Sequence, residues 1–194
     1  MKRYLILTLM LAACTHEEPA PSPSPEPAPS TVSDFPEQAW TDALAKAVKE
    51  TGLDQLQPSD CRGADWVKLL VKVSDFESDT RYKHCPTCRR FDPRAEYIES
   101  FDDRTGKPVS SRGLFQMSIE SSNGNYACGF ANADEIFDPL KAIPCAAKAM
   151  AKLVKRDGVL SGYSGGRWQG GSAYWAVLRN PGKLAAIKAA GGCK

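Results

Sequence analysis

Apolar residues recur at three- and four-residue spacing through much of residues 35–194, which is the period of an amphipathic α-helix. The first such segment is residues 37–50, where Trp40, Leu44 and Val48 fall on one face. We therefore predict a helix over this segment.

The same period continues in the C-terminal half. It predicts a helix over residues 139–154, which Gly158 would end, and shorter helical pieces over 172–178 and 183–190. Between residues 79 and 112 the period is lost, and charged residues, proline and glycine predict long loops or a small hairpin. The expected fold is a mainly α domain with one loop-rich lobe and a cleft beside it.

A second helical segment carries a glutamate in line with its apolar face. Asp65 suits the N-cap position, and the residues from Trp66 to Phe76 include one apolar face. Glu77 stands eleven positions after Trp66 and four after Val73, so at about 100° per residue it returns to that face. We expect the helix to end at Glu77, beside core residues.

A carboxyl group in this position has two interpretations. Desolvation and the negative end of the helix dipole would both raise the pKa of Glu77, which suits a general acid near neutral pH. Alternatively, Glu77 turns outward to solvent or pairs with Arg81.

The N-terminus predicts export. Residues 1–13 combine a basic start with an apolar run about half as long as a membrane-spanning helix, which is typical of a signal peptide. The sequence Leu-Ala-Ala-Cys resembles a bacterial lipobox, which implies cleavage before Cys14 and lipidation of its thiol. The alternative is an ordinary secretory signal. Residues 14–34 are proline-rich and predict an extended linker, which leaves residues 35–194 as one domain.

The net charge of the domain excludes few classes of binding partner. Residues 35–194 hold 23 basic and 19 acidic residues, a net charge of +4. A mildly basic domain tolerates an anionic polymer. The sequence lacks the dense lysine and arginine stripe of nucleic-acid-binding proteins, so we expect no nucleic-acid partner.

Six cysteines remain after Cys14, and an even number in an exported chain predicts up to three disulfides. They are Cys61, Cys85, Cys88, Cys128, Cys145 and Cys193. Fifteen pairings are possible, and Cys128 with Cys145 is the preferred one because these residues flank one short segment. For the CxxC pair at 85 and 88, a local disulfide or two bridges to elsewhere is favoured over a redox or zinc site. His84 is the only histidine of the domain.

Two short motifs resemble the lysozyme-like lytic transglycosylase family. They are Phe-Glu-Ser at 76–78 and Ser-x-Gly-Leu-x-Gln at 111–116, and the resemblance covers roughly residues 64–179. It implies a lysozyme-like (α+β) fold in which Glu77 is the catalytic acid/base. It also implies that five neighbouring residues line the cleft: Ser78, Ser111, Gly113, Leu114 and Gln116.

The resemblance also implies a tyrosine that faces the acid. Tyr174 matches that position, with Tyr163 as a weaker candidate, although the family's usual Tyr-Asn-Ala-Gly is replaced by Tyr-Trp-Ala-Val here. Other aromatic residues, including Tyr97, Tyr126 and Trp168, suit either a sugar-stacking cleft or an ordinary core.

The spacing between the motifs departs from the family. Gly113 lies 36 positions after Glu77 but only 14 after Glu99, which is closer to the family's usual gap. Glu77 is preferred as the acid because it follows a strongly amphipathic helix. Glu99 is the candidate for a second carboxylate that activates water, or it holds Arg104 or Arg112.

The resemblance implies cleavage of the β-1,4 bond between N-acetylmuramic acid and N-acetylglucosamine. A lytic transglycosylase needs one acid, because the sugar's own 6-hydroxyl closes a 1,6-anhydro ring. The alternatives are a hydrolytic muramidase on the same scaffold and a non-catalytic peptidoglycan-binding lipoprotein.

The expected partners are peptidoglycan glycan strands and a membrane, reached through the lipid on Cys14. The expected location is the periplasmic face of the outer membrane, with the cell surface or secretion as alternatives. We expect a monomer without a metal or organic cofactor. Three basic residues either bind carboxylates of the glycan strand or are ordinary solvent-exposed surface residues: Arg167, Arg179 and Lys107.

Overall fold

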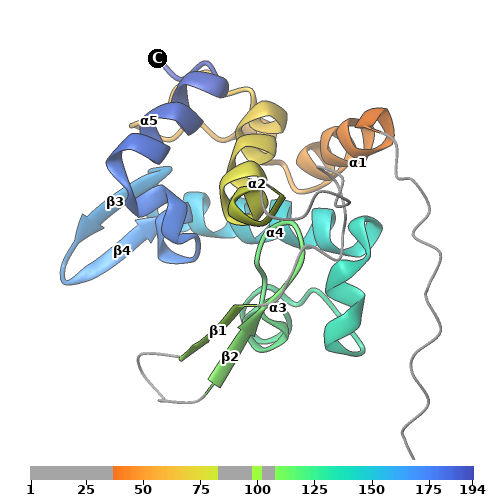
Figure 1. The fold of residues 1–194 in the computed structure, drawn as a ribbon. Helices are drawn as coiled ribbons and strands as arrows, with labels where there is room; N and C mark the ends of the chain where they lie inside the picture. Colours follow the sequence, from red (N-terminus) through yellow and green to blue (C-terminus); the bar gives the residue numbers. More distant parts are fainter. Residues whose placement is uncertain (1–36, 83–97, 102–107) are drawn as a thin grey trace, which may run out of the picture. The chain divides into compact units, whose positions relative to one another are not determined.

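Within the described residues, five helices form the frame of the fold (Figure 1). The computed structural model describes residues 37–82, 98–101 and 108–194, all within one unit that spans residues 32–194. The helices are α1 (Glu37–Glu50), α2 (Trp66–Tyr82), α3 (Ile119–Tyr126), α4 (Pro139–Asp157) and α5 (Pro181–Ala190). A mainly α fold is therefore confirmed. None of the helices in these ranges is both long enough and apolar enough to cross a membrane.

Helix α4 packs against several neighbours at once. Asp138 caps its start by accepting a hydrogen bond from the Leu140 N–H at 2.9 Å, and Gly158 ends it with a φ of 70°. Its buried side chains include Ile143 and Met150, and it contacts α1, α3 and the strand β4 (Arg167–Gly170). The predicted helix over 139–154 is confirmed and extends to residue 157.

Helix α2 begins as expected but ends later. The Asp65 carboxylate accepts a hydrogen bond from the Lys68 N–H at 3.2 Å, which confirms the N-cap. The expectation that the helix ends at Glu77 is wrong, because the helix continues to Tyr82. The apolar stripe marks the part of a helix that is buried, whereas polar residues can extend it by backbone hydrogen bonding alone.

The expected helix over residues 172–178 is two 3-10 turns instead, η3 (Gly171–Ala173) and η4 (Ala176–Arg179). They are separated at Trp175, whose backbone is extended and whose buried indole N–H donates to the Phe115 carbonyl at 3.0 Å. Anchoring this indole in the core overrides the local helical period.

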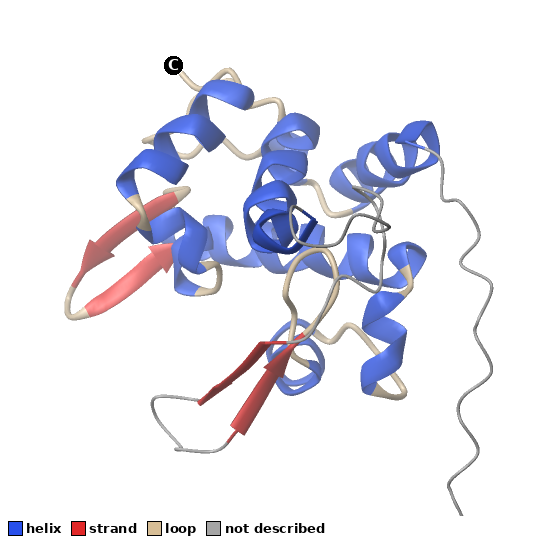
Figure 2. Cartoon of the chain, viewed as in Figure 1, coloured by secondary structure: helices blue, strands red, loops and turns tan. Residues whose placement is uncertain are grey.

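The strands in the described ranges are confined to two antiparallel hairpins (Figure 2). Strands β1 (Ile98–Phe101) and β2 (Pro108–Ser111) form the small hairpin expected between residues 79 and 112. Strands β3 (Ser161–Ser164) and β4 form a second hairpin, which the periodicity did not predict. The 3-10 turns η1 (Leu53–Gln55) and η2 (Ala133–Phe137) and helix α3 were likewise not predicted.

Within the described residues the structure holds two disulfides, one closing a short loop and one a long loop. Cys128 pairs with Cys145, which confirms the preferred pairing, and Cys61 pairs with Cys193 across 132 positions. The CxxC cysteines, Cys85 and Cys88, lie outside the described residues, as does Cys14.

Candidate active site

Glu77 projects from α2 into a largely dry environment. Its side chain is half-buried, and Oε1 is inaccessible to solvent and has no hydrogen-bond partner among the described residues. Burial raises the pKa of Glu77 from its ordinary value of 4.5 to about 7. The Val177 N–H, which donates to the carboxylate, and the charges of Lys183 and Arg179 offset part of this rise.

A carboxyl group with this pKa is suited to proton transfer. Near pH 7 it is present in both forms, so it can donate a proton and take one back within one reaction cycle. The pKa is raised by burial, so the helix dipole invoked from the sequence is not needed, since α2 continues past this residue.

Two basic side chains act on the acid. The charges of Lys183 on α5 and Arg179 on η4 both lower the pKa of Glu77, and the Lys183 ammonium group lies 5.4 Å from the centre of the Phe76 ring. The Nε–H of Arg179 donates a hydrogen bond to the Ser172 carbonyl at 2.8 Å. The carboxyl group therefore lies among cations that can receive anionic groups of a ligand.

Tyr174 lies on the same site. Its Oη accepts a hydrogen bond from the Ser118 N–H at 3.1 Å, and its ring packs edge-on against Tyr126 and Trp175 at 5.6 Å and 4.9 Å between centroids. Burial raises the pKa of Tyr174, and so does the charge of Glu77. The structure therefore brings the predicted acid and the predicted tyrosine within electrostatic reach of each other.

The Gly-Leu-x-Gln segment is a tight loop held at both ends. Arg112 and Met117 exchange two backbone hydrogen bonds of 2.9 Å, and the Gln116 side chain donates to the Gly113 carbonyl at 2.9 Å. Gly113 has a φ of 70°, and a Cβ there would lie 2.8 Å from the Ile136 carbonyl oxygen. Only glycine fits this position without a shift of the backbone.

The remaining predicted site residues differ in burial and in hydrogen bonding. Ser78 is buried and donates its hydroxyl to the Ser74 carbonyl at 2.6 Å, whereas Leu114 is a core residue with 2 % exposure. Ser111 is half-buried at the end of β2.

Two other candidates fall where side chains are not described. The backbone of Glu99 pairs with Ser110 between β1 and β2, and its side chain lies outside the described part. Tyr97 lies outside the described residues altogether.

Sequence reasoning missed two contributors to the site, Lys183 and the backbone N–H of Val177. Both follow Tyr174 by fewer than ten positions, so the tyrosine motif was the available signal. No group of three or more histidine, cysteine, aspartate or glutamate side chains within the described ranges could hold a metal ion.

Comparisons with known proteins find similar solved structures. No protein-family model matches the chain, and no curated protein matches its sequence. Solved structures of Bd0314 DslA are similar: the wild-type form is 29 % identical with a TM-score of 0.65, covering 81 % of this chain and 92 % of that chain. A variant of that protein is 27 % identical with a TM-score of 0.67, covering 85 % and 95 %. Two of the similar structures are glutamate-to-glutamine variants at different positions.

The likeness extends over most of the chain. Together with the helical frame and small hairpins, it gives a mainly α, lysozyme-like (α+β) domain as the fold.

Proposed function

We propose that this chain is a glycosidase that cleaves the β-1,4 bond between N-acetylmuramic acid and N-acetylglucosamine in peptidoglycan. The observation that supports it is Glu77, a half-buried carboxyl group with a pKa of about 7 beside Tyr174 on a lysozyme-like fold. Burying a carboxyl group without full hydrogen bonding is unfavourable, so a protein that only binds glycan would gain nothing from it.

In the proposed reaction, protonated Glu77 donates its proton to the glycosidic oxygen. The bond from this oxygen to C1 of the muramyl sugar breaks, and its electron pair leaves with the oxygen as a hydroxyl group. The 6-hydroxyl of the muramyl sugar attacks C1 and returns its proton to Glu77, which gives a 1,6-anhydro end. Tyr174 is a positioning residue in this scheme, because its Oη is held by the Ser118 N–H and it interacts electrostatically with Glu77. The reaction needs no cofactor.

A hydrolytic muramidase is the second candidate. The similar solved protein was studied with two different glutamates replaced by glutamine, and hydrolysis of a glycoside normally uses two carboxyl groups. Glu99 would be the second carboxyl group here, activating a water molecule in place of the 6-hydroxyl.

The N-terminal segment supports a proposed location. Lipidation of Cys14 would anchor the chain to a membrane, and the proline-rich residues 14–34 would let residues 35–194 reach the cell wall. We propose the periplasmic face of the outer membrane, with the catalytic domain acting as a monomer on glycan strands.

Release of dye from labelled peptidoglycan tests the proposal. The wild-type chain should release dye, Glu77→Gln should lose at least about a hundredfold in rate, and Glu120→Gln should match wild type. Glu120 is a suitable control because it is an exposed glutamate on α3. Equal release by wild type and Glu77→Gln would refute the assignment of the acid. No release by wild type from several wall types would favour a non-catalytic glycan-binding lipoprotein.

A further inference from the structure

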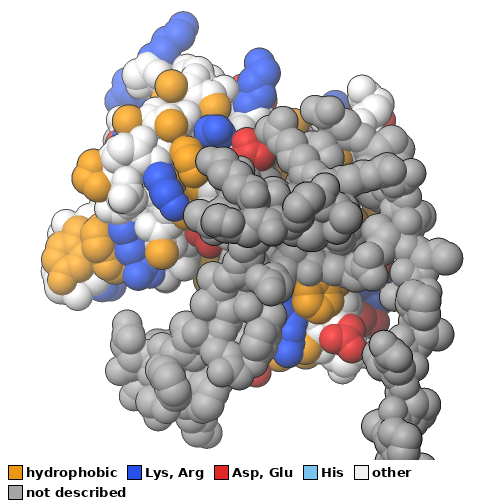
Figure 3. Space-filling view, viewed as in Figure 1, with side chains coloured by type: hydrophobic (Ala, Val, Ile, Leu, Met, Phe, Trp, Pro, Cys, Tyr) orange, Lys and Arg blue, Asp and Glu red, His pale blue; other side chains and the backbone are white. Residues whose placement is uncertain are grey.

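The β3–β4 hairpin displays two aromatic rings to solvent. Tyr163 is 63 % exposed and Trp168 is 36 % exposed, and Leu140 is the only other large hydrophobic residue that is exposed in the described ranges. Tyr163 and Trp168 are direct cross-strand partners, with ring centroids 5.0 Å apart. Figure 3 shows hydrophobic side chains gathered at this hairpin, with lysine and arginine side chains beside them.

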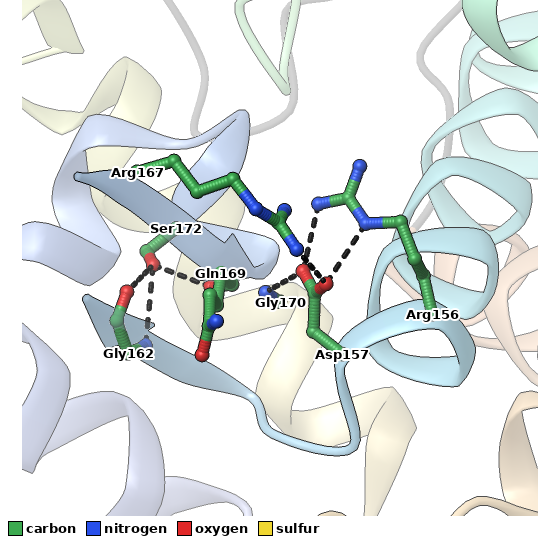
Figure 4. A network of polar contacts seen from close by, with 7 residues as sticks. All are labelled: Arg156, Asp157, Gly162, Arg167, Gln169, Gly170 and Ser172. Carbon is green, nitrogen blue, oxygen red and sulfur yellow. Dashed lines mark hydrogen bonds and ion pairs between the residues drawn. The ribbon is translucent and has the colours of Figure 1, made fainter. Parts of the chain in front are cut away.

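The hairpin is held firmly in place. Gly165 and Gly166 both have positive φ, which gives the two-residue turn that suits the twist of a hairpin. The Asp157 carboxylate at the end of α4 is 1 % exposed and accepts hydrogen bonds from Arg167 and from the Gly170 N–H at 3.1 Å and 2.7 Å (Figure 4). The backbone that carries the two rings is therefore held in place without a ligand.

Arg179 connects this aromatic pair with the candidate acid. Its guanidinium carbon lies 5.4 Å from the centre of the Trp168 ring, and its positive charge lowers the pKa of Glu77. Its Nε–H donates a hydrogen bond to the Ser172 carbonyl at 2.8 Å, which helps to hold the side chain in place. The guanidinium group of Arg179 therefore contacts the hairpin and also acts electrostatically on the acid.

We propose that Tyr163, Trp168 and Arg179 form a carbohydrate subsite that holds a further part of the glycan strand cleaved at Glu77. The C–H face of a pyranose ring packs on an exposed indole or phenol, and the guanidinium group can pair with a carboxylate of the strand. The inference rests on the proposed function, since it takes the ligand to be the same glycan.

A glycan strand suits this surface better than a protein does. Two rings and one guanidinium group offer far less area than the roughly 800 Å² that each partner contributes to a stable protein interface. A narrow strand of sugars, however, needs only one ring per contact. The net positive charge of residues 35–194 also favours a strand that carries carboxylates.

Trp168 offers a direct readout. The chain has four tryptophans, and the other three, Trp40, Trp66 and Trp175, are at most 2 % exposed. Quenching of tryptophan fluorescence by acrylamide therefore reports mainly on Trp168. The full chain carrying Glu77→Gln would be titrated with a tetrasaccharide of alternating N-acetylglucosamine and N-acetylmuramic acid. Binding at the proposed subsite should protect the quenchable fluorescence.

Calorimetry on the same Glu77→Gln chain measures the affinity. Adding Trp168→Ala should weaken binding of the tetrasaccharide about three- to tenfold, and Trp168→Phe should restore most of the affinity. Leu140→Ala is the matched control, because Leu140 is 64 % exposed outside the hairpin, and it should leave the affinity unchanged.

The outcomes separate this inference from the proposed function. If wild type cleaves peptidoglycan but the tetrasaccharide binds without protecting Trp168, the subsite is refuted and the function stands. If wild type neither cleaves nor binds glycan, both fail. Self-association of the chain that Trp168→Ala abolishes, without glycan protection, would identify the hairpin as a protein contact and also overturn the subsite.

Discussion

Glu77 is the candidate catalytic acid, and its position on the apolar face of α2 could be predicted from the sequence. The angle along the helix placed it beside core residues, and the structure finds it half-buried with a raised pKa. The groups that modulate this pKa, Val177, Lys183 and Arg179, come from a segment about 100 positions later. No periodicity within one helix can reveal contacts of that kind.

The raised pKa makes stability depend on pH. Because the pKa of Glu77 is about 7 in the folded chain and near 4.5 in the unfolded chain, the folded state loses stability as pH rises from 4.5 to 7. Glu77→Gln removes this loss. The difference in free energy of unfolding between Glu77→Gln and wild type should therefore shift in favour of the variant by on the order of 2 to 3 kcal/mol from pH 5 to pH 8.

Urea denaturation at both pH values measures this difference. Glu120→Gln should show no such change, because Glu120 is exposed. A constant difference between wild type and Glu77→Gln from pH 5 to pH 8 would mean that the carboxyl group is not protonated in the folded chain near neutrality.

The same residue should set the alkaline limb of the activity profile. If protonated Glu77 is the acid, kcat/KM should fall about tenfold per pH unit above about pH 7. Lys183 lowers the pKa of Glu77, so Lys183→Met should move this limb to higher pH. Initial rates on peptidoglycan from pH 5 to pH 9 measure the position of this limb. If Lys183→Met leaves the limb at the same pH, the charge of Lys183 does not lower the pKa of Glu77.

At the scale of elements, the long helices and the shorter α5 could be predicted, whereas α3, the 3-10 turns and the β3–β4 hairpin could not. The period of α1 and α4 is carried by many residues, whereas each strand of the β3–β4 hairpin has only four. The available signal for that hairpin was the Gly165-Gly166 pair, a turn sequence that periodicity does not detect. The break at Trp175 follows from a tertiary hydrogen bond to Phe115 and has no local signal.

The loop that follows β2 should tolerate no side chain at Gly113. Gly113→Ala must adopt a positive φ and also place its Cβ against the Ile136 carbonyl. We expect a loss of about 3 kcal/mol in free energy of unfolding, measured by thermal or urea denaturation.

Gly129→Ala is the control for this change. Gly129 has a similar φ of 76°, but nothing lies within 4 Å of a Cβ built there, so only the backbone penalty of about 1 kcal/mol applies. Equal losses from both changes would show that the contact with Ile136 is unimportant.

At the scale of the whole molecule, the sequence predicted a mainly α fold and a disulfide framework but could not give the full pairing. Six cysteines allow fifteen arrangements, and only the short Cys128–Cys145 loop could be preferred by position. The Cys61–Cys193 bridge joins the start of the domain to its end, a proximity that arises only when α5 packs on α2.

The two bridges should differ in their contribution to stability. In the loop-entropy model, closing 132 positions stabilises by about 5 kcal/mol and closing 17 positions by about 3 kcal/mol. Paired Cys→Ser changes, Cys61 with Cys193 and Cys128 with Cys145, should therefore lower the melting temperature to different degrees in calorimetry, with the larger drop for the long loop. The reverse order would mean that strain or residual structure in the unfolded chain outweighs loop closure.

Mass spectrometry of the soluble products released from peptidoglycan by wild type, Glu77→Gln and Glu99→Gln would show whether Glu77 is the single catalytic acid. We expect 1,6-anhydromuramyl ends from wild type and from Glu99→Gln, and none from Glu77→Gln. Reducing muramyl ends that disappear with either change would identify the hydrolytic muramidase. Products that persist in Glu77→Gln would contradict the assignment of Glu77 as the acid.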